Sequence, residues 1–407
     1  MNMIPLSELI LDAKSGFASG EKDNEGIAQI RMNNVTTDGE LDLSSIRRVP
    51  VKTVKNVESF ILNEGDVLFN STNSSNLVGK SVRFVEQNEP FVFSNHFLRL
   101  VPDPEQLESP YLARWLTYQQ QQGVFELLCT KWVNQAAVRR GDLLALKIPL
   151  PPLPEQRRIA AVLDAADALR AKRRAALAKL DALLQSVFLE MFGDPVRNEK
   201  GWEVVTVSDV AAKEKYSIKA GPFGSSLRKE YYVPVGYKIY GQEQVIRDDL
   251  TYGDYYIDQA RYDSLKANRI KAGDILISLV GTFGKVSVVP EDFEPGIINP
   301  RLMKITLDRH KMHPLFFKQL LSMPSILNRI TDDSHGGTMG IVNVGIMKDV
   351  PIPAPPIDIQ ERYVEILDRI NEIKAQFSLN HERFMTLFES LQQRAFRGEL
   401  SSIERNK

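Results

Sequence analysis

The residue patterns in this 407-residue chain that could support catalysis each lack an essential member. Residues 79–81, Gly-Lys-Ser, resemble the end of the phosphate-binding loop G-x-x-x-x-G-K-[ST], but Ser74 occupies the position of its first glycine. The related segment GTFGKV at 281–286 fails in the same way. We therefore interpret both as one Gly-Lys turn that occurs in two copies of a strand pair, and predict no nucleotide site.

No other set of side chains matches a catalytic or metal-binding pattern. The five histidines lack the spacing of metal ligands, and neither a cysteine nor a His-Glu-x-x-His companion accompanies His310 and His313. Asn299-Pro300-Arg301 is the nearest match to the Asn-Pro-Pro-aromatic loop of adenine methyltransferases, and it lacks the second proline and the aromatic residue. We predict that the chain is not an enzyme and holds no metal or cofactor of its own.

Two long matching segments dominate the sequence. Residues 148–192 begin with the lead-in IPLPPLPEQRR, and residues 352–396 begin with IPAPPIDIQER. A run without proline or glycine follows each lead-in, and it is rich in residues that favour helix. Both the starts (352 − 148) and the ends (396 − 192) of the two segments are 204 positions apart. The sequence therefore predicts two long helices of equal length.

Apolar residues recur along both segments at steps of three and four, as in a coiled coil or helix bundle. A basic cluster lies midway along the first segment, and it is interpreted either as a solvated face or as a contact for partner helices or a DNA backbone. Its members are Arg170, Lys172, Arg173, Arg174 and Lys179. The apolar positions that we expect to face a partner helix are Ile159, Leu163, Leu177, Leu184, Phe188, Ile366, Ile370, Phe377, Phe384 and Leu391.

The regions before and between the two segments also match each other. Both contain short β-rich runs opened by Gly-Asp turns. The matched pairs are IPLSELI at Ile4 with VTVSDVA at Val205, SGFASG at Ser15 with AGPFGS at Ala220, EGDVLFN at Glu64 with AGDILIS at Ala272, and FSNHFLRL at Phe93 with IINPRLMKI at Ile297.

The chain is thus predicted to be an internal duplication, in which each globular region is followed by a long helix. If the first helix leads from one globule to the other, the second must lead back. We therefore expect antiparallel helices, with the globules at opposite ends and related by an approximate two-fold axis.

Composition limits the classes of protein that the chain can belong to. The single cysteine, Cys129, excludes an internal disulfide framework and suits a reducing compartment. The formal net charge of −1 gives no overall nucleic-acid signature, so a DNA-binding surface would have to be local. The first residues do not form a signal peptide, and no apolar run reaches the roughly 18 residues of a membrane span. A cytoplasmic protein is expected.

In these features the chain resembles the specificity subunits of type I restriction-modification systems. The resemblance covers essentially the full length, and its most specific part is the Pro-Pro-x-x-x-Gln lead-in of IPLPPLPEQRRIAAVLDAAD. The GPFGS turn, the Gly-Asp strands and the second IPAPP helix add to it, although the second lead-in reads IDIQER where the first reads LPEQRR.

The resemblance implies an α+β fold, with two mixed α/β target-recognition domains that are related by a pseudo-two-fold axis. Two long antiparallel helices separate them as a coiled-coil spacer. The corresponding ranges are residues 1–147 and 197–350 for the target-recognition domains and residues 148–196 and 351–407 for the spacer helices.

The resemblance also implies a function. Each domain would read one half of a bipartite double-stranded DNA site, while the helices set the gap and dock two adenine-methyltransferase subunits. Restriction subunits would join that core, and S-adenosylmethionine, ATP and Mg²⁺ are expected on these partners. Symmetry of this kind favours half-sites about one helical turn apart. A four-residue insertion in the helices, roughly 6 Å of rise, should lengthen the gap by about one or two base pairs.

Polar loops with small and basic residues are the candidate readers, because such side chains recognise base edges. Among them Lys80, Lys131, Arg139 and Lys285 are expected to contact phosphates, which position a protein without specifying sequence. The full candidate set is Arg31, Asn73, Ser74, Ser75, Asn76, Lys80, Lys131, Trp132, Asn134, Arg139, Lys219, Ser225, Ser226, Arg228, Gln242, Thr282, Lys285, His335 and Thr338.

Other classes of protein stay open at this stage. One is a P-loop NTPase, which the missing glycine argues against. A second is a coiled-coil adaptor that joins two protein-binding globules without DNA, and a third is the DNA-binding module of a modification-only system. Strand register is not fixed by the sequence, so the DNA target itself is not predicted.

Overall fold

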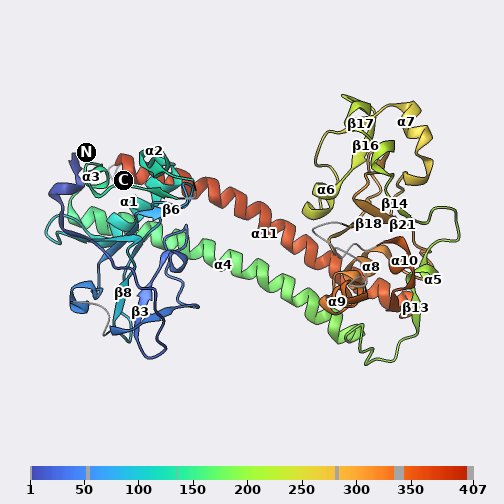
Figure 1. Cartoon of the computed structure of the whole chain (residues 1–407), viewed down its shortest axis with the longest axis horizontal. Coiled ribbons are helices and arrows are strands. Elements are labelled where there is room, and N and C mark those ends of the chain that lie inside the picture. Colours follow the sequence, from blue (N-terminus) through green and yellow to red (C-terminus); the bar gives the residue numbers. More distant parts are fainter. Residues whose placement is uncertain (1, 52–55, 134, 280–283, 334–342, 401–407) are drawn as a thin grey trace, which may run out of the picture. The chain divides into compact units, whose positions relative to one another are not determined.

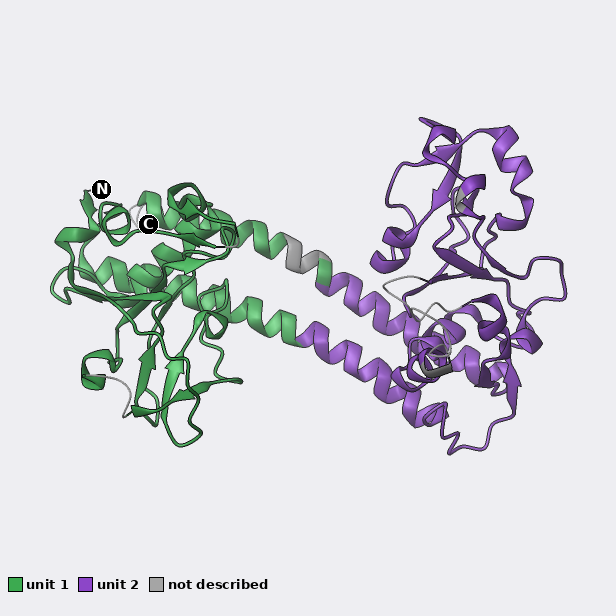
Figure 2. Ribbon diagram, in the orientation of Figure 1, with its two compact units in different colours: residues 1–175, 378–407 green, residues 176–377 purple. Residues whose placement is uncertain are grey.

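The computed structural model describes residues 2–51, 56–133, 135–279, 284–333 and 343–400, with the side chains of residue 224 and of residues 332–333 and 379–382 left aside. The chain divides into two compact units (Figure 2). Unit 1 contains residues 1–175 and 378–407, and unit 2 contains residues 176–377. The long helices pass from one unit into the other, so each unit receives half of each helix.

The two predicted helices are confirmed as α4, Leu153–Phe192, and α11, Ile357–Arg397 (Figure 1). Each begins directly after a proline pair and stops at a glycine with positive φ, Gly193 (φ 74) and Gly398 (φ 77). A residue in the left-handed region just past the last turn is a common helix terminator, and glycine adopts it without steric cost. The sequence therefore fixes both ends of both helices locally.

The helices run antiparallel, as the contacts inside each unit demonstrate. In unit 1, Arg170 of α4 lies over the ring of Phe388 of α11 at 4.6 Å. In unit 2, Phe188 of α4 packs edge-on against Tyr363 of α11, with centroids 5.6 Å apart. The early part of each helix thus lies beside the late part of the other.

Unit 1 contains a four-stranded antiparallel sheet in the order β2-β9-β5-β7 and a three-stranded sheet in the order β4-β3-β8, in which β3 and β8 are parallel. A short sheet β10-β11-β6 and the pair β1-β12 complete it. The elements are β1 (Met3–Pro5), β2 (Ile10–Ser15), β3 (Ile27–Ile30), the 3-10 turn η2 (Met32–Asn34), β4 (Arg47–Val49), β5 (Val67–Asn70), β6 (Thr72–Asn73), β7 (Ser81–Arg83), β8 (Phe91–Phe93), β9 (Phe97–Pro102), α1 (Ser109–Gln121), α2 (Val124–Leu128), β10 (Thr130–Lys131), β11 (Ala136–Ala137), α3 (Arg140–Leu144) and β12 (Lys147–Pro149).

Unit 2 repeats this plan, with sheets β14-β21-β18-β19 and β15-β17-β16-β20 and the pair β13-β22. Strands β16 and β20 are parallel, as β3 and β8 are. The elements are β13 (Val204–Thr206), α5 (Val207–Val210), β14 (Ile218–Ala220), β15 (Tyr232–Val233), β16 (Tyr237–Tyr240), α6 (Gln242–Arg247), β17 (Tyr256–Ile257), α7 (Gln259–Ser264), β18 (Ile275–Ser278), β19 (Val286–Val288), β20 (Gly296–Ile298), β21 (Leu302–Ile305), α8 (Pro314–Leu321), α9 (Pro324–Asp333), α10 (Val344–Asp349) and β22 (Pro351–Pro353).

The proline-rich lead-ins are strands that close each unit. Ile148 of β12 pairs with Ile4 of β1, and Ile352 of β22 pairs with Val205 of β13. The glutamine of each lead-in is fully buried. Gln156 Nε2 donates to the carbonyls of Pro151 and Gln106, both at 2.8 Å, and Gln360 makes the equivalent bonds in unit 2. The Pro-Pro-x-x-x-Gln pattern is thus a structural clamp between the helix start and the globule.

The Gly-Asp turns have the same geometry in both units. Asp66 Oδ2 accepts the amide of Asn63, and Asp274 Oδ2 accepts the amide of Lys271, each at 2.9 Å. Burial raises the pKa of both carboxyl groups. The predicted duplication is confirmed at the level of individual hydrogen bonds.

The apolar faces of α4 and α11 are buried inside the units. Ile159, Leu163 and Phe388 lie in the core of unit 1, and Leu184, Phe188 and Ile370 lie in the core of unit 2. Leu391 and Ile366 pack partly buried against these cores, and Leu177 and Phe384 are half-buried. Phe377 is 40% exposed, so it contributes little to this packing.

Candidate nucleic-acid interface

In unit 1 three connections meet where parallel strands β3 and β8 end. The register pairs Ile30 with Phe93, so the turns that follow them emerge together. The end of β5 joins them, because the carbonyl of His96 accepts the amide of Ser71 at 2.9 Å and Nδ2 of Asn70 at 3.0 Å. We call this set, Arg31–Asn34, Asn70–Asn73 and Ser94–His96, the first polar edge.

Within this edge, Arg31 lies close enough to His96 to affect its charge. Burial and then the nearby charge of Arg31 lower the pKa of His96. The carboxyl ends of parallel strands are where open α/β sheets bind ligands. Three segments far apart in sequence bring the guanidinium of Arg31 and several side-chain amides together at this edge.

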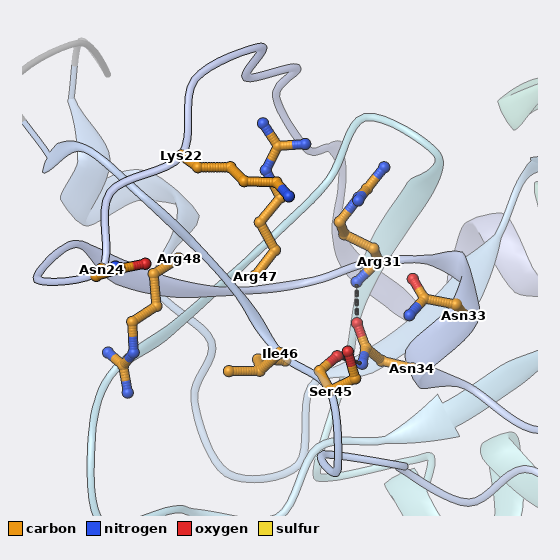
Figure 3. Close-up of a pocket in the computed structure, with 9 residues that line it drawn as sticks. All are labelled: Lys22, Asn24, Arg31, Asn33, Asn34, Ser45, Ile46, Arg47 and Arg48. Carbon is orange, nitrogen blue, oxygen red and sulfur yellow. Dashed lines mark hydrogen bonds between the residues drawn. The ribbon is translucent and has the colours of Figure 1, made fainter.

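A basic pocket of about 280 Å³ adjoins the edge (Figure 3). Its lining holds four cationic side chains and no acidic one. In Figure 3 Lys22, Arg31 and Arg47 point to one side of the pocket, while Arg48 points away. Guanidinium and amide groups in this combination suit phosphate oxygens and base edges. The lining residues are Lys22, Asn24, Arg31, Asn33, Asn34, Ser45, Ile46, Arg47 and Arg48.

The pocket is held in shape by its own hydrogen bonds. Asn34 Nδ2 donates to the carbonyls of Asp42 and Ser45, both at 2.9 Å, and its Oδ1 accepts the amide of Arg31 at 3.0 Å. Arg47 Nη2 is bound to two carbonyls at 2.8 Å, while its buried Nε has no partner. Among the described residues, the side chains of Lys22 and Arg31 form no ion pair, so both charges are available to a ligand.

Unit 2 carries a second polar edge at the equivalent strand ends. Gln242 Nε2 donates to Ser278 Oγ at 2.8 Å, and Arg301 Nη1 donates to Gln242 Oε1 at 3.4 Å. The amide of Gly241 is capped by Gln244 Oε1 at 3.0 Å, as that of Arg31 is capped by Asn34. The two edges thus have one backbone plan and different side chains.

Of the residues predicted as readers, Arg31 and Gln242 lie on the polar edges. Asn73 also lies there, but its Nδ2 is bound at 2.6 Å to Asn70 Oδ1. Ser74, Ser75 and Asn76 continue the loop after it, half-buried to exposed.

Other predicted readers lie on exposed turns outside the two edges. Lys131 and Trp132 are exposed on the β10–β11 hairpin, with Lys131 3.3 Å from Glu126, and Arg139 is exposed just after it. In unit 2, Ser225, Arg228 and Lys285 are exposed, while Lys219 and Ser226 are half-buried. Asn134, Thr282, His335 and Thr338 lie outside the described residues.

The prediction for Lys80 is wrong. Its ammonium group is buried and donates to the carbonyls of Met32 at 2.7 Å and Val35 at 2.5 Å, so it supports the 3-10 turn η2 from inside. Burial lowers its pKa. Its counterpart Lys285 is exposed. A Gly-Lys sequence is therefore compatible with either orientation of the lysine.

The Gly-Lys turns themselves are structural, as predicted. Gly79 (φ 91) and Gly284 (φ 89) have positive φ, and a Cβ at either would lie 2.2 Å from Phe125 or 2.5 Å from Leu327. Only glycine fits between the turn and the helix above it. No phosphate-binding role is needed to explain these residues.

Sequence reasoning missed most of the basic pocket and Arg301. Arg47 and Arg48 open β4, and Lys22 precedes β3, so their approach to Arg31 depends on tertiary structure. The match of FSNHFLRL with IINPRLMKI did relate the segment of Arg301 to that of His96, and this was the available signal.

The basic side chains clustered on α4 lie in different environments. Arg170 is buried in unit 1, Arg173 lies 4.6 Å from the ring of Phe384, and Arg174 is bound to Asp38 at 2.7 Å. Lys172, Arg174 and Lys179 are exposed, while Arg173 is half-buried. All three arginines contact groups within unit 1, so the cluster is more than a solvated face.

The described residues contain neither a metal-binding cluster nor a membrane-spanning helix. No group of three or more His, Cys, Asp or Glu side chains is placed to hold a metal ion. No helix there combines the length and apolar character needed to cross a bilayer.

Two units of one topology, each with a polar edge at the ends of a parallel strand pair, define a duplicated α+β recognition protein. Comparison with known sequences identifies the family. The family description "Type I restriction modification DNA specificity domain" matches residues 9–179 and 199–380. The chain belongs to this family, whose members are non-catalytic DNA-recognition components.

Similar sequences cover nearly the whole chain. The MjaX chain of Methanocaldococcus jannaschii, named as a type I restriction enzyme specificity subunit, is 25% identical over 385 residues, which are 90% of this chain and 86% of the relative. The EcoKI specificity subunit of Escherichia coli is 24% identical over 394 residues, 92% of this chain and 82% of the relative.

Solved structures show the same fold. The S subunit of a type I restriction-modification system from M. genitalium gives a TM-score of 0.57 at 15% identity and covers 97% of this chain and 96% of its own. A chain from a structure of complex assembly in the type I system gives 0.60 at 18% identity, with 98% of both chains covered.

Proposed function

We propose that this chain is the DNA-reading subunit of a type I restriction-modification complex, and that each unit contacts one half of a bipartite duplex site. The observation that carries this proposal is the pair of polar edges. Unit 1 carries Arg31 and His96 there, and unit 2 carries Gln242 and Arg301, on equivalent turns of a chain from a DNA specificity family. Because these side chains differ, the two half-sites are expected to differ in sequence.

The basic pocket gives unit 1 its backbone contact in this proposal. Arg47 and Lys22 lie beside Arg31, so a phosphate bound by them would place a base edge within reach of Arg31 and Asn33. Phosphate contacts fix orientation, and amide or guanidinium contacts to bases then discriminate sequence. The overall charge of −1 is no obstacle, since four cationic side chains line this one pocket.

Two adenine-methyltransferase subunits are proposed to dock on α4 and α11, with restriction subunits joining that core. Leu169 (49% exposed) and Leu387 (66%) support this, because large apolar side chains on a long helix favour protein contacts. S-adenosylmethionine, ATP and Mg²⁺ are then bound by these partners. We place the complex in the cytoplasm, with which the single cysteine Cys129 agrees.

The test is selection from a pool of random duplexes by the full chain assembled with a methyltransferase subunit. The expected result is a two-part motif with a fixed gap, methylated at adenine in each half. Enrichment of a single undivided motif, or of no motif, would contradict the proposal. A protein adaptor without DNA function would retain no duplex under the same conditions, and nucleotide binding by the isolated chain would favour an NTPase.

A further inference from the structure

A carboxylate near the first polar edge binds the spacer helix. Asp38 lies on the turn Thr36–Gly39, which follows the reading turn η2. Its Oδ1 accepts Arg170 Nη2 at 3.2 Å, and its Oδ2 accepts Arg174 Nη1 at 2.7 Å. The hydrogen bond with Asp38 raises the pKa of Arg174. A loop of the recognition globule is thereby joined to α4 by two charged bonds.

On the α4 side, the contact is made by Arg170, which several other groups hold in place. Arg170 is 5% exposed, and its Nη1 donates to Asp167 Oδ1 at 2.8 Å. Asp167 also binds Arg114 of α1 at 2.8 Å, while the Arg170 guanidinium covers the Phe388 ring of α11. Three helices of unit 1 therefore meet around Arg170. Its position cannot change without disturbing all of them.

On the other side, the contact leads directly to the reading residues. The amide of Gly39 bonds to the carbonyl of Thr36 at 3.3 Å, and the amide of Thr36 to the carbonyl of Glu40 at 3.0 Å, which closes the turn. Asn34 then ties η2 to the same loop through the carbonyl of Asp42, at 2.9 Å. Arg31 and Asp38 are thus two ends of one braced segment.

Unit 2 lacks this connection among its described residues. Asp248 follows the capping residue Gln244 by four positions, as Asp38 follows Asn34, but it binds Lys318 of α8 and accepts Ser287 Oγ at 2.8 Å. Lys374, which stands 204 positions after Arg170, pairs instead with Asp181 of α4 at 2.5 Å. The equivalent carboxylate therefore stays within its own globule.

We propose that Asp38 is a positioning residue, which locks the first reading turn to α4 and so determines how sharply the first half-site is discriminated. This inference rests on the proposed function. A reading side chain must be held in place to distinguish one base edge from another, since a loose one meets several bases equally well. Asp38 supplies that restraint without touching DNA itself.

The test compares Asp38→Asn with wild type and with Asp248→Asn, using the full chain assembled with its methyltransferase partner. Asn keeps the size of the side chain and removes the charge. In selection from random duplexes, D38N is expected to lower discrimination at the first half-site about tenfold, or about 1.4 kcal/mol. Discrimination at the second half-site should stay at the wild-type level. D248N should leave the first half-site unchanged.

Two further variants separate positioning from folding. Arg174 is 44% exposed at its side chain, so Arg174→Gln opens no cavity and should give a smaller loss at the first half-site. Asp38→Glu keeps the charge and should restore discrimination.

The inference is overturned if D38N selects DNA as wild type does, or if D38N weakens both half-sites together with a lower melting temperature. If wild type itself selects no bipartite site, the proposed function fails, and the inference fails with it.

Discussion

At the residue scale, two lysines in matched positions have opposite roles. Lys80 donates to the carbonyls of Met32 and Val35 under the reading turn, whereas Lys285 is exposed. Both follow a glycine that has positive φ and where a nearby side chain leaves no room for a Cβ. The duplication preserved the backbone of the turn and left the direction of the lysine to the packing around it.

Replacing Lys80 by methionine is expected to destabilise unit 1. The carbonyls of Met32 and Val35 would lose a charged donor, and each buried group left unpaired costs about 1–3 kcal/mol. Hydrogen exchange of the amides in residues 31–36 measures the loss. Lys285→Met is the matched control and should change exchange in unit 2 by less than about 0.5 kcal/mol. Equal effects of the two substitutions would contradict the buried role of Lys80.

Arg31→Ala is expected to weaken binding to the first half-site by about 1–3 kcal/mol and to relax sequence preference there. The reason is that Arg31 forms no ion pair within the described residues and borders the basic pocket. Lys147 is exposed on β12 and outside the pocket lining, so Lys147→Ala is the charge-matched control. Binding is measured on duplexes altered in one half-site at a time. A loss shared equally by both half-sites would refute the assignment of Arg31 to unit 1 recognition.

At the element scale, helix α8 starts on a titratable cap. Nδ1 of His313 accepts the amide of Leu315 at 3.2 Å, and the His313 amide donates to the buried Gln360 at 2.9 Å. Burial lowers the pKa of His313. Only the neutral ring of His313 can accept this hydrogen bond at Nδ1. The cap at the start of α8 therefore depends on the protonation state of His313.

The stability of α8 is therefore expected to depend on pH. Because the folded-state pKa lies below the unfolded value of about 6.5, the cap contributes fully above that value and is lost as the pH falls through and below it. His313→Asn keeps an acceptor at the cap and removes the titration. Hydrogen exchange of α8 between pH 5 and 8 should show the dependence in wild type and not in H313N. His310 is exposed, so His310→Asn serves as the control. If H313N showed the same pH dependence as wild type, this account of the cap would be contradicted.

At the scale of the whole molecule, one topology occurs twice with different surface chemistry. The strand orders β2-β9-β5-β7 and β14-β21-β18-β19 are equivalent, as are the parallel pairs β3-β8 and β16-β20. Asp38 reaches the spacer helix and Asp248 does not. The two halves are therefore expected to respond differently to mutation.

Lengthening both spacer helices should change the DNA gap. Four residues inserted into each of α4 and α11 add roughly 6 Å and just over one turn, which nearly preserves the apolar faces. The gap in the methylated site should grow by about one or two base pairs, as methylome sequencing would report. A four-residue insertion in the exposed turn near Lys200 is the control and should leave the gap as it was. An unchanged gap in the helix variant would rule out the spacer role.

The sequence by itself determined the two helices, their nearly equal length (40 and 41 residues) and the duplicated strands. These depend on local features, namely proline pairs, runs without glycine, Gly-Asp turns and a glycine after each last turn, which act through the nearest residues. The buried Gln156 and Gln360 were visible as a pattern, although their role as clamps was not. Internal alignment added the topology, because two copies with one pattern must fold alike.

Only the tertiary structure decided which polar residues face outward. Lys80 points inward because it donates to carbonyls almost fifty residues away in sequence. Arg170 is buried because it contacts Asp38, Asp167 and Phe388, which lie on separate elements. Arg47 reached the basic pocket because β4 pairs with β3, and Arg301 reached the second polar edge because β21 pairs with β18. The burial of a charged side chain depends on long-range neighbours, and their positions follow from packing, which local sequence does not encode.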